Sequence, residues 1–259
     1  MAAARSVSFL AMKSRAVFIS LGVMGAIIDT ILGEANTNMP QGETISLIAG
    51  GTGLVGRHVM QQLGASGEQM IVIARRPIDD LPASASLFET DFDRLVDGLT
   101  LPDASHAYIC LGTTIKKAGS REAFRRVDHD YVIAMAQLAY ESGVRRLAVV
   151  SAVGATTDTN NFYTKIKGEV EEAIAEFRFE HLTFVRPGLI LGDRVNDFRL
   201  GEQVAVMLTP LFNPLLRGKA TQFRSIHARD IAAAMIAQVR LGLPGVHHLT
   251  YADMMELST

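Results

Sequence analysis

A tyrosine, a lysine and a serine are the residues of this chain whose types and spacing best suit proton transfer. Tyr163 and Lys167 are four positions apart, so they share one face of a helix, and Ser151 ends an apolar run twelve residues before the tyrosine. A phenol donates a proton to a developing alkoxide or takes one from an alcohol. Lowering its pKa from about 10 to about 7 requires roughly 4 kcal/mol, and the Lys167 ammonium has the right charge to contribute. We therefore predict Tyr163 as proton donor or acceptor, Lys167 beside it, and Ser151 orienting the substrate oxygen.

A glycine-rich turn is the first element needed to place such a group. The apolar run 45–49 leads into glycines that fit two registers, Gly51-x-Gly53-x-x-Gly56 and Gly50-x-x-Gly53-x-x-Gly56. Either register lets a pyrophosphate approach bare backbone at a helix N-terminus, although glycine turns also serve ordinary loops. The predicted cofactor contacts here are Gly50, Gly51, Thr52, Gly53, Leu54, Val55 and Gly56.

The second apolar run, 69–74, ends in Arg75 and Arg76, where an NAD-preferring site would carry an acidic residue for the adenosine ribose. A guanidinium at that point pairs with a ribose 2′-phosphate. The pair therefore favours NADP(H) over NAD(H), and the alternative is that the two arginines only solvate a loop.

The order of the apolar segments predicts an α/β fold. Helical patterns alternate with strand patterns, which indicates a Rossmann doubly wound parallel sheet with helices on both faces and a small C-terminal cap. A helix is expected over 120–142, and Gly64 is expected to end the helix 55–63. Ligands lie at the carboxyl ends of parallel strands. The further predicted cofactor contacts at this edge are Asp91, Leu111, Gly112, Thr113, Tyr163, Lys167, Pro187 and Gly188.

Composition excludes several classes of function. The 259 residues carry a formal charge of −2 with a pI near 6.4, so there is no basic face of the kind that nucleic acid requires. The single cysteine, Cys110, excludes an internal disulfide and a cysteine cluster for zinc or iron–sulfur, and we predict no metal site.

The first forty residues differ from the rest in composition. Arg5, Lys13 and Arg15 precede an apolar stretch, 16–28, that is short for a membrane span. Residues 1–40 are therefore interpreted as an extension: a targeting segment, or a mis-assigned start if Met39 is the true first residue. Residues 41–259 form the nucleotide-binding domain, with 192–225 as the cap segment. We expect a cytoplasmic protein with membrane contact only through the extension, if it is retained.

Taken together, these segments resemble an atypical, extended short-chain dehydrogenase/reductase of the epimerase-like kind. The runs 110–114, 124–132, 163–171 and 186–188, with Gly192-Asp193-Arg194, are particularly similar to the Tat-interacting oxidoreductase-like branch. The resemblance implies NADPH binding and a role for Tyr163 in turnover of a small carbonyl or alcohol. It leaves open two alternatives, an NADPH-sensing regulatory protein that contacts a protein partner, and an epimerase or dehydratase. Homodimers are frequent in the superfamily.

Overall fold

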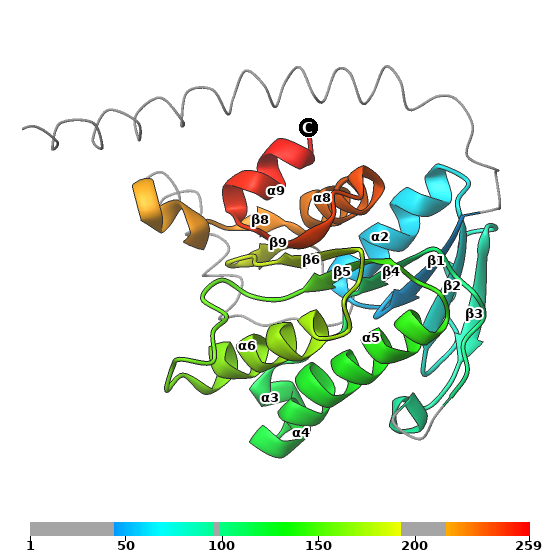
Figure 1. The fold of residues 1–259 in the computed structure, drawn as a ribbon, viewed down its shortest axis with the longest axis horizontal. Coiled ribbons are helices and arrows are strands. Elements are labelled where there is room, and N and C mark those ends of the chain that lie inside the picture. Colours follow the sequence, from blue (N-terminus) through cyan, green and yellow to red (C-terminus); the bar gives the residue numbers. More distant parts are fainter. Residues whose placement is uncertain (1–43, 96–98, 193–215) are drawn as a thin grey trace, which may run out of the picture. The chain divides into compact units, whose positions relative to one another are not determined.

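The computed structural model describes residues 44–95, 99–192 and 216–259. Its main element is a seven-stranded sheet in the order β3-β2-β1-β4-β5-β6-β9 (Figure 1). Every neighbouring pair in this sheet is parallel. The strands are β1 (Ile45–Ala49), β2 (Gln69–Ala74), β3 (Ala85–Glu89), β4 (His106–Ile109), β5 (Arg146–Val150), β6 (His181–Val185) and β9 (Gly245–Leu249). The predicted Rossmann architecture is confirmed.

Helices cover both faces of the sheet (Figure 1). On one face lie α2, α8 and α9, whose apolar side chains pack with Ile48 and Tyr108 of the sheet. On the other face α5 and α6 pack with Leu47 and Phe184. Because both faces are buried, the central strands read as continuous apolar runs rather than as alternating ones. The helices are α2 (Leu54–Ala65), α3 (Ile115–Ala118), α4 (Arg121–Arg125), α5 (Tyr131–Glu141), α6 (Phe162–Ala175), α8 (Ala228–Leu241) and α9 (Tyr251–Leu257).

The predicted helix over 120–142 is helical from Arg121 to Glu141, but a π-helical turn, η2 (Arg126–Asp130), interrupts it. A π turn adds a residue to one turn of the helix and is frequent at functional sites. Here the turn carries the buried Asp128. The interruption therefore coincides with a buried carboxylate.

Gly64 does not end the first helix as expected, because α2 continues through it to Ala65. A Cβ at Gly64 would lie 2.8 Å from the Cβ of Pro82, so this glycine permits close packing of the segment before β3. Its role in the fold is steric.

Short elements complete the described chain. Two-residue strands β7 (Ile190–Leu191) and β8 (Ile226–His227) pair in parallel, and two 3₁₀ helices, η1 (Phe92–Leu95) and η4 (Gly218–Phe223), precede β4 and β8. Most of the predicted cap segment 192–225, and the whole extension 1–40, lie outside the described residues. Within the described part of the chain, no helix is both long and apolar enough to span a membrane.

Candidate active site

The glycine turn after β1 is built for close contact between backbones. Gly50 has φ +88°, and a Cβ there would lie 2.6 Å from the carbonyl oxygen of Cys110. The amide of Gly53 donates to the Gly50 carbonyl oxygen at 2.9 Å. A Cβ at Gly56 would lie 2.2 Å from that same oxygen. Gly50, Gly53 and Gly56 thus form one packed unit, which is the second of the two registers read from the sequence.

The turn leaves the N-terminus of α2 open to an anion. Gly53 is the N-cap, so no side chain caps the first amide groups of the helix, and its first turn holds no acidic residue. Uncapped amides and the positive end of the helix dipole attract phosphate. The predicted contacts from Thr52 to Val55 lie here, although the side chain of Val55 is buried in the core. This cradle fits the pyrophosphate of a dinucleotide.

A pocket of about 450 Å³ lies beyond the carboxyl ends of β2 and β3. It brings together the predicted residues Arg75, Arg76 and Asp91. The guanidinium of Arg75 lies over the ring of Phe92, 5.6 Å from the ring centroid, which holds it at the pocket wall. The residues that line the pocket are Arg75, Arg76, Glu89, Thr90, Asp91 and Arg94. Three guanidinium groups and two carboxylates thus line this pocket.

Tyr163 and Lys167 lie one turn apart on α6, as predicted. Asn161 caps this helix by accepting a hydrogen bond from the amide of Thr164 at 3.1 Å. The loop before it packs on α6 at Gly168, where a Cβ would lie 2.3 Å from the backbone carbon of Thr156. The cap at Asn161 and the loop packed at Gly168 therefore hold the first half of α6, which carries Tyr163, in place.

Lys167 is buried and paired with Asp128 of η2. Its Nζ lies 2.8 Å from Oδ1 of Asp128, and their side chains are 6% and 2% exposed. The other carboxylate oxygen accepts a hydrogen bond from the amide of Thr113 at 2.7 Å. The predicted residues Thr113 and Lys167 are thus linked through an aspartate that the sequence predictions did not include.

The surroundings of Tyr163 raise its pKa. Burial of the hydroxyl is the main cause; the Lys167 charge acts in the opposite direction, and the Asp128 charge adds to the rise. Lys167 thus acts on the pKa in the predicted direction, but its effect is outweighed. The tyrosine still reaches the surface, since 38% of the residue is exposed, and its ring lies 5.9 Å from that of Phe124. It lies in the first turn of α6.

One signal in the sequence marks Asp128. It lies four residues after Phe124 and four before Val132, both of which are buried in the structure. A carboxylate on the apolar stripe of a helix requires a buried partner. That partner is Lys167, and the π turn is the local geometry that carries Asp128 into the protein.

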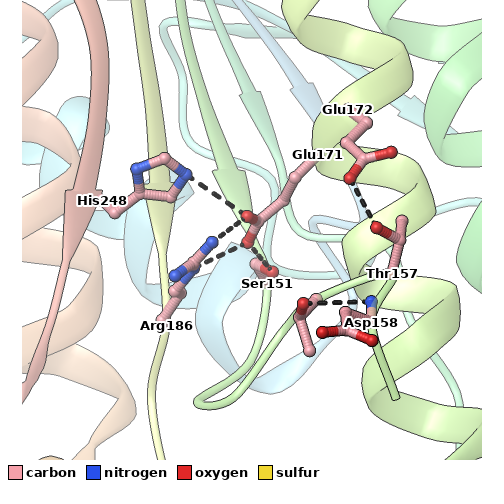
Figure 2. Close-up of polar contacts among 8 residues, drawn as sticks. Ser151, Thr157, Asp158, Glu171, Glu172, Arg186 and His248 are labelled. Atoms are coloured by element: carbon pink, nitrogen blue, oxygen red, sulfur yellow. Dashed lines mark hydrogen bonds and ion pairs between the residues drawn. The ribbon is translucent and has the colours of Figure 1, made fainter. Parts of the chain in front are cut away.

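Ser151 lies at the end of β5, as predicted, but its hydroxyl donates to Glu171 of α6. Glu171 is also held by Arg186, through Nε at 3.0 Å and through Nη2, and lies 3.3 Å from Nε2 of His248 (Figure 2). Burial lowers the pKa of His248. Among the described residues, no hydrogen bond joins Ser151 to Tyr163 or Lys167. Its substrate-orienting role stays a prediction, and the interaction seen is structural.

The other predicted contacts lie at the same edge. Gly112 borders Asp128, since a Cβ there would lie 3.3 Å from Oδ1, and the Leu111 side chain is buried in the core. The carbonyl of Pro187 accepts from the amide of Val153 at 3.0 Å. Gly188 lies against the backbone of Phe223, because a Cβ there would lie 3.0 Å from the Phe223 carbonyl oxygen.

Comparison with protein families and curated proteins gives consistent matches. A family model described as NAD(P)H-binding matches residues 50–240. The protein FMP52, mitochondrial, of Eremothecium gossypii is 32% identical over 204 residues, covering 76% of this chain and 87% of the relative. The protein HTATIP2 of Rattus norvegicus is 42% identical over 98 residues, covering 38% of this chain and 40% of the relative.

Solved structures share the fold. A UDP-glucose 4-epimerase superposes with a TM-score of 0.62 at 15% identity, covering 83% of this chain and 80% of that one. The human epimerase family protein SDR39U1, solved with NADPH, gives a TM-score of 0.54 at 20% identity, covering 80% and 74%. At this identity the similarity establishes the architecture alone.

Proposed function

The chain belongs to the NAD(P)H-binding family and to the epimerase-like short-chain dehydrogenase/reductases, and from that premise we propose that it is an NADP(H)-dependent oxidoreductase. Its substrate is a small carbonyl or alcohol. The observation that carries the proposal is the placement of Tyr163 and Lys167 at the carboxyl edge of the same sheet whose first turn, Gly50 to Gly56, is shaped for a dinucleotide. A phenol beside a cofactor site is the group that such a reaction needs.

The residues present fit the cofactor. Open amides at the start of α2 would hold the pyrophosphate, and Arg75 and Arg76 would hold a ribose 2′-phosphate. The preference for NADP(H) over NAD(H) is part of the proposal and rests on those two arginines. When bound, the nicotinamide supplies or accepts the hydride.

The protein supplies the proton and the orientation. In the reductive direction the Tyr163 hydroxyl donates its proton to the substrate oxygen, and the Lys167 ammonium stabilises the phenolate that remains. Asp128 holds Lys167 through the 2.8 Å ion pair and is itself fixed by the Thr113 amide.

The test is NADPH consumption against a panel of aldehydes and ketones, with Tyr163→Phe compared with Tyr140→Phe. Tyr140 lies on α5 among aromatic side chains and is the matched control. We expect Tyr163→Phe to abolish turnover with NADPH affinity nearly unchanged, and Tyr140→Phe to keep its turnover. Turnover that survives in Tyr163→Phe would remove the catalytic assignment.

One observation favours a second function, that of an NADPH-sensing protein with little turnover. The hydroxyl of Ser151 is committed to Glu171, and Ala152 follows it where a second hydroxyl would stand. A sensor needs the cofactor site but no substrate-orienting group. Tight NADPH binding without turnover across the carbonyl panel would support this function over the first.

We also propose that residues 1–38 direct the chain to mitochondria. The FMP52 relatives are mitochondrial by name, and the cytoplasmic expectation has no support from them. Arg5, Lys13 and Arg15 with no acidic residue before Asp29 are typical of an organellar targeting segment. A fluorescent fusion of the whole chain should localise to mitochondria and a fusion that starts at Met39 should not; the same location for both would refute the proposal.

A further inference from the structure

The ion pair beside Tyr163 is more enclosed than a lysine at the mouth of a cofactor site requires. Lys167 and Asp128 are 6% and 2% exposed at their side chains, and both carboxylate oxygens of Asp128 are engaged, one by Nζ of Lys167 and one by the amide of Thr113. Water therefore screens neither charge well. At Tyr163 the two charges act in opposite directions, and the effect of Lys167 is larger than that of Asp128.

The charged groups that act on the Tyr163 hydroxyl, in the part of the chain described, are these two. Lys167 lies on the same helix, Asp128 comes from η2, and the neighbouring ring on α4 is the uncharged Phe124. An uncompensated ammonium would favour the phenolate, whereas an ammonium neutralised by a carboxylate does so weakly. Burial of the hydroxyl is then the dominant effect on the Tyr163 pKa, and burial favours the neutral phenol.

We propose that Asp128 offsets part of the effect of the Lys167 charge at the Tyr163 hydroxyl, so that Tyr163 is held as a proton donor and the site is set for carbonyl reduction. This inference rests on the proposed function. In the step it implies, the carbonyl carbon receives a hydride, with its two electrons, from reduced NADPH, and the carbonyl oxygen receives the proton of Tyr163. The product is an alcohol, and the phenolate regains its proton from water. Asp128 is a positioning residue, because it acts through Lys167.

The direct measurement is the titration of Tyr163 in the full chain. The protein is labelled with ring-¹³C tyrosine, and the Cζ signal of Tyr163, one of five tyrosines, is assigned by its loss in Tyr163→Phe. Wild type is compared with Asp128→Asn and with the matched control Asp130→Asn. Asp130 lies on the same π turn and loses the same charge, but its side chain is 48% exposed and pairs with His129.

In wild type the midpoint should lie above the value of free tyrosine, about 10, or beyond the pH at which the fold is lost. In Asp128→Asn the midpoint should move to lower pH, while in Asp130→Asn it should stay at the wild-type value. A wild-type midpoint clearly below that of free tyrosine overturns the proposal and needs no variant to fold. A midpoint that does not fall in folded Asp128→Asn overturns it as well.

Turnover gives a separate readout. In Asp128→Asn the alkaline limit of carbonyl reduction should move to lower pH together with the titration, because reduction requires the protonated phenol. If Tyr163 titrates as described but the protein reduces no carbonyl, the result supports the effect of Asp128 on the Lys167 charge. The same result refutes the proposed oxidoreductase function. The two failures are thus distinguishable.

Discussion

Removal of Arg75 and Arg76 should weaken NADPH binding and leave NADH binding nearly unchanged. The two nucleotides differ at the ribose 2′ position, where NADPH carries a phosphate. The pocket beyond β2 and β3 holds both arginines, and Arg75 is further held over the ring of Phe92. The double variant Arg75→Ala with Arg76→Ala therefore removes contacts that only one of the two ligands makes.

The magnitude follows from the position of these side chains. Both arginines are exposed, so water weakens each contact with phosphate to about 1 to 1.5 kcal/mol, at or below the low end of the roughly 1.5 to 3 kcal/mol of a hydrogen bond to a charged group. Two such contacts give about 2 to 3 kcal/mol, or roughly 30- to 150-fold in Kd. Glu89 and Asp91 line the same pocket and repel phosphate in wild type and in the double variant alike, so they do not change the expected loss.

The assay is a titration of each protein with NADPH and with NADH, followed by nucleotide fluorescence. Arg178→Ala is the control, because Arg178 is also exposed and lies before β6, at the opposite edge of the sheet. It should bind both nucleotides as wild type does. An equal loss of NADPH and NADH affinity in the double variant, or no loss of either, would refute the assignment of this pocket.

Three further predictions concern the turn, the Glu171 cluster and pH. Gly56→Ala should lower affinity for NADPH and NADH alike, because its Cβ would lie 2.2 Å from the Gly50 carbonyl oxygen; unchanged titrations would contradict this steric role. Glu171→Gln should lower the free energy of unfolding, measured in urea, by about 2 to 3 kcal/mol. This is a small value for a broken buried ion pair, because the Arg186 side chain is 29% exposed. The control Glu172→Gln, at an exposed position, should change the free energy of unfolding by less than about 0.5 kcal/mol. Burial lowers the pKa of His181, so the unfolded chain binds the proton more tightly and stability should fall as pH drops below about 6.5; urea unfolding that gives the same slope against pH in His181→Gln would exclude this source.

The sequence was sufficient for the features that are local in the chain. Apolar runs between glycines and helical stripes predicted the strands and helices of a parallel sheet, and the parallel topology then placed every strand end at one edge. The glycine turn, the arginines after β2 and the pair Tyr163 and Lys167 follow from that topology. Each of these features is formed by residues that are close together in the chain.

The partners of the buried charges could not be predicted from the sequence. Asp128 and Lys167 are 39 residues apart in the chain, and Glu171 and Arg186 come from a helix and from the end of a strand. Such pairing depends on which side of each helix faces its neighbours. The extra residue of a π turn changes that side for the residues that follow. For the same reason Ser151 was placed at the correct edge, while the contact of its hydroxyl with Glu171 was not foreseen.

The two ion pairs together explain how α6 holds Tyr163 in place. Tyr163, Lys167 and Glu171 follow one another at intervals of four residues, so they lie along one face of the helix. Lys167 is tied to η2 through Asp128, and Glu171 is tied to the ends of β5 and β6 through Ser151 and Arg186. A buried charge without its partner costs free energy, so few other rotations of α6 about its axis, or shifts along it, are possible. The charges that fix the tyrosine in place are balanced within each pair, and its position is therefore set without driving the phenol to ionise.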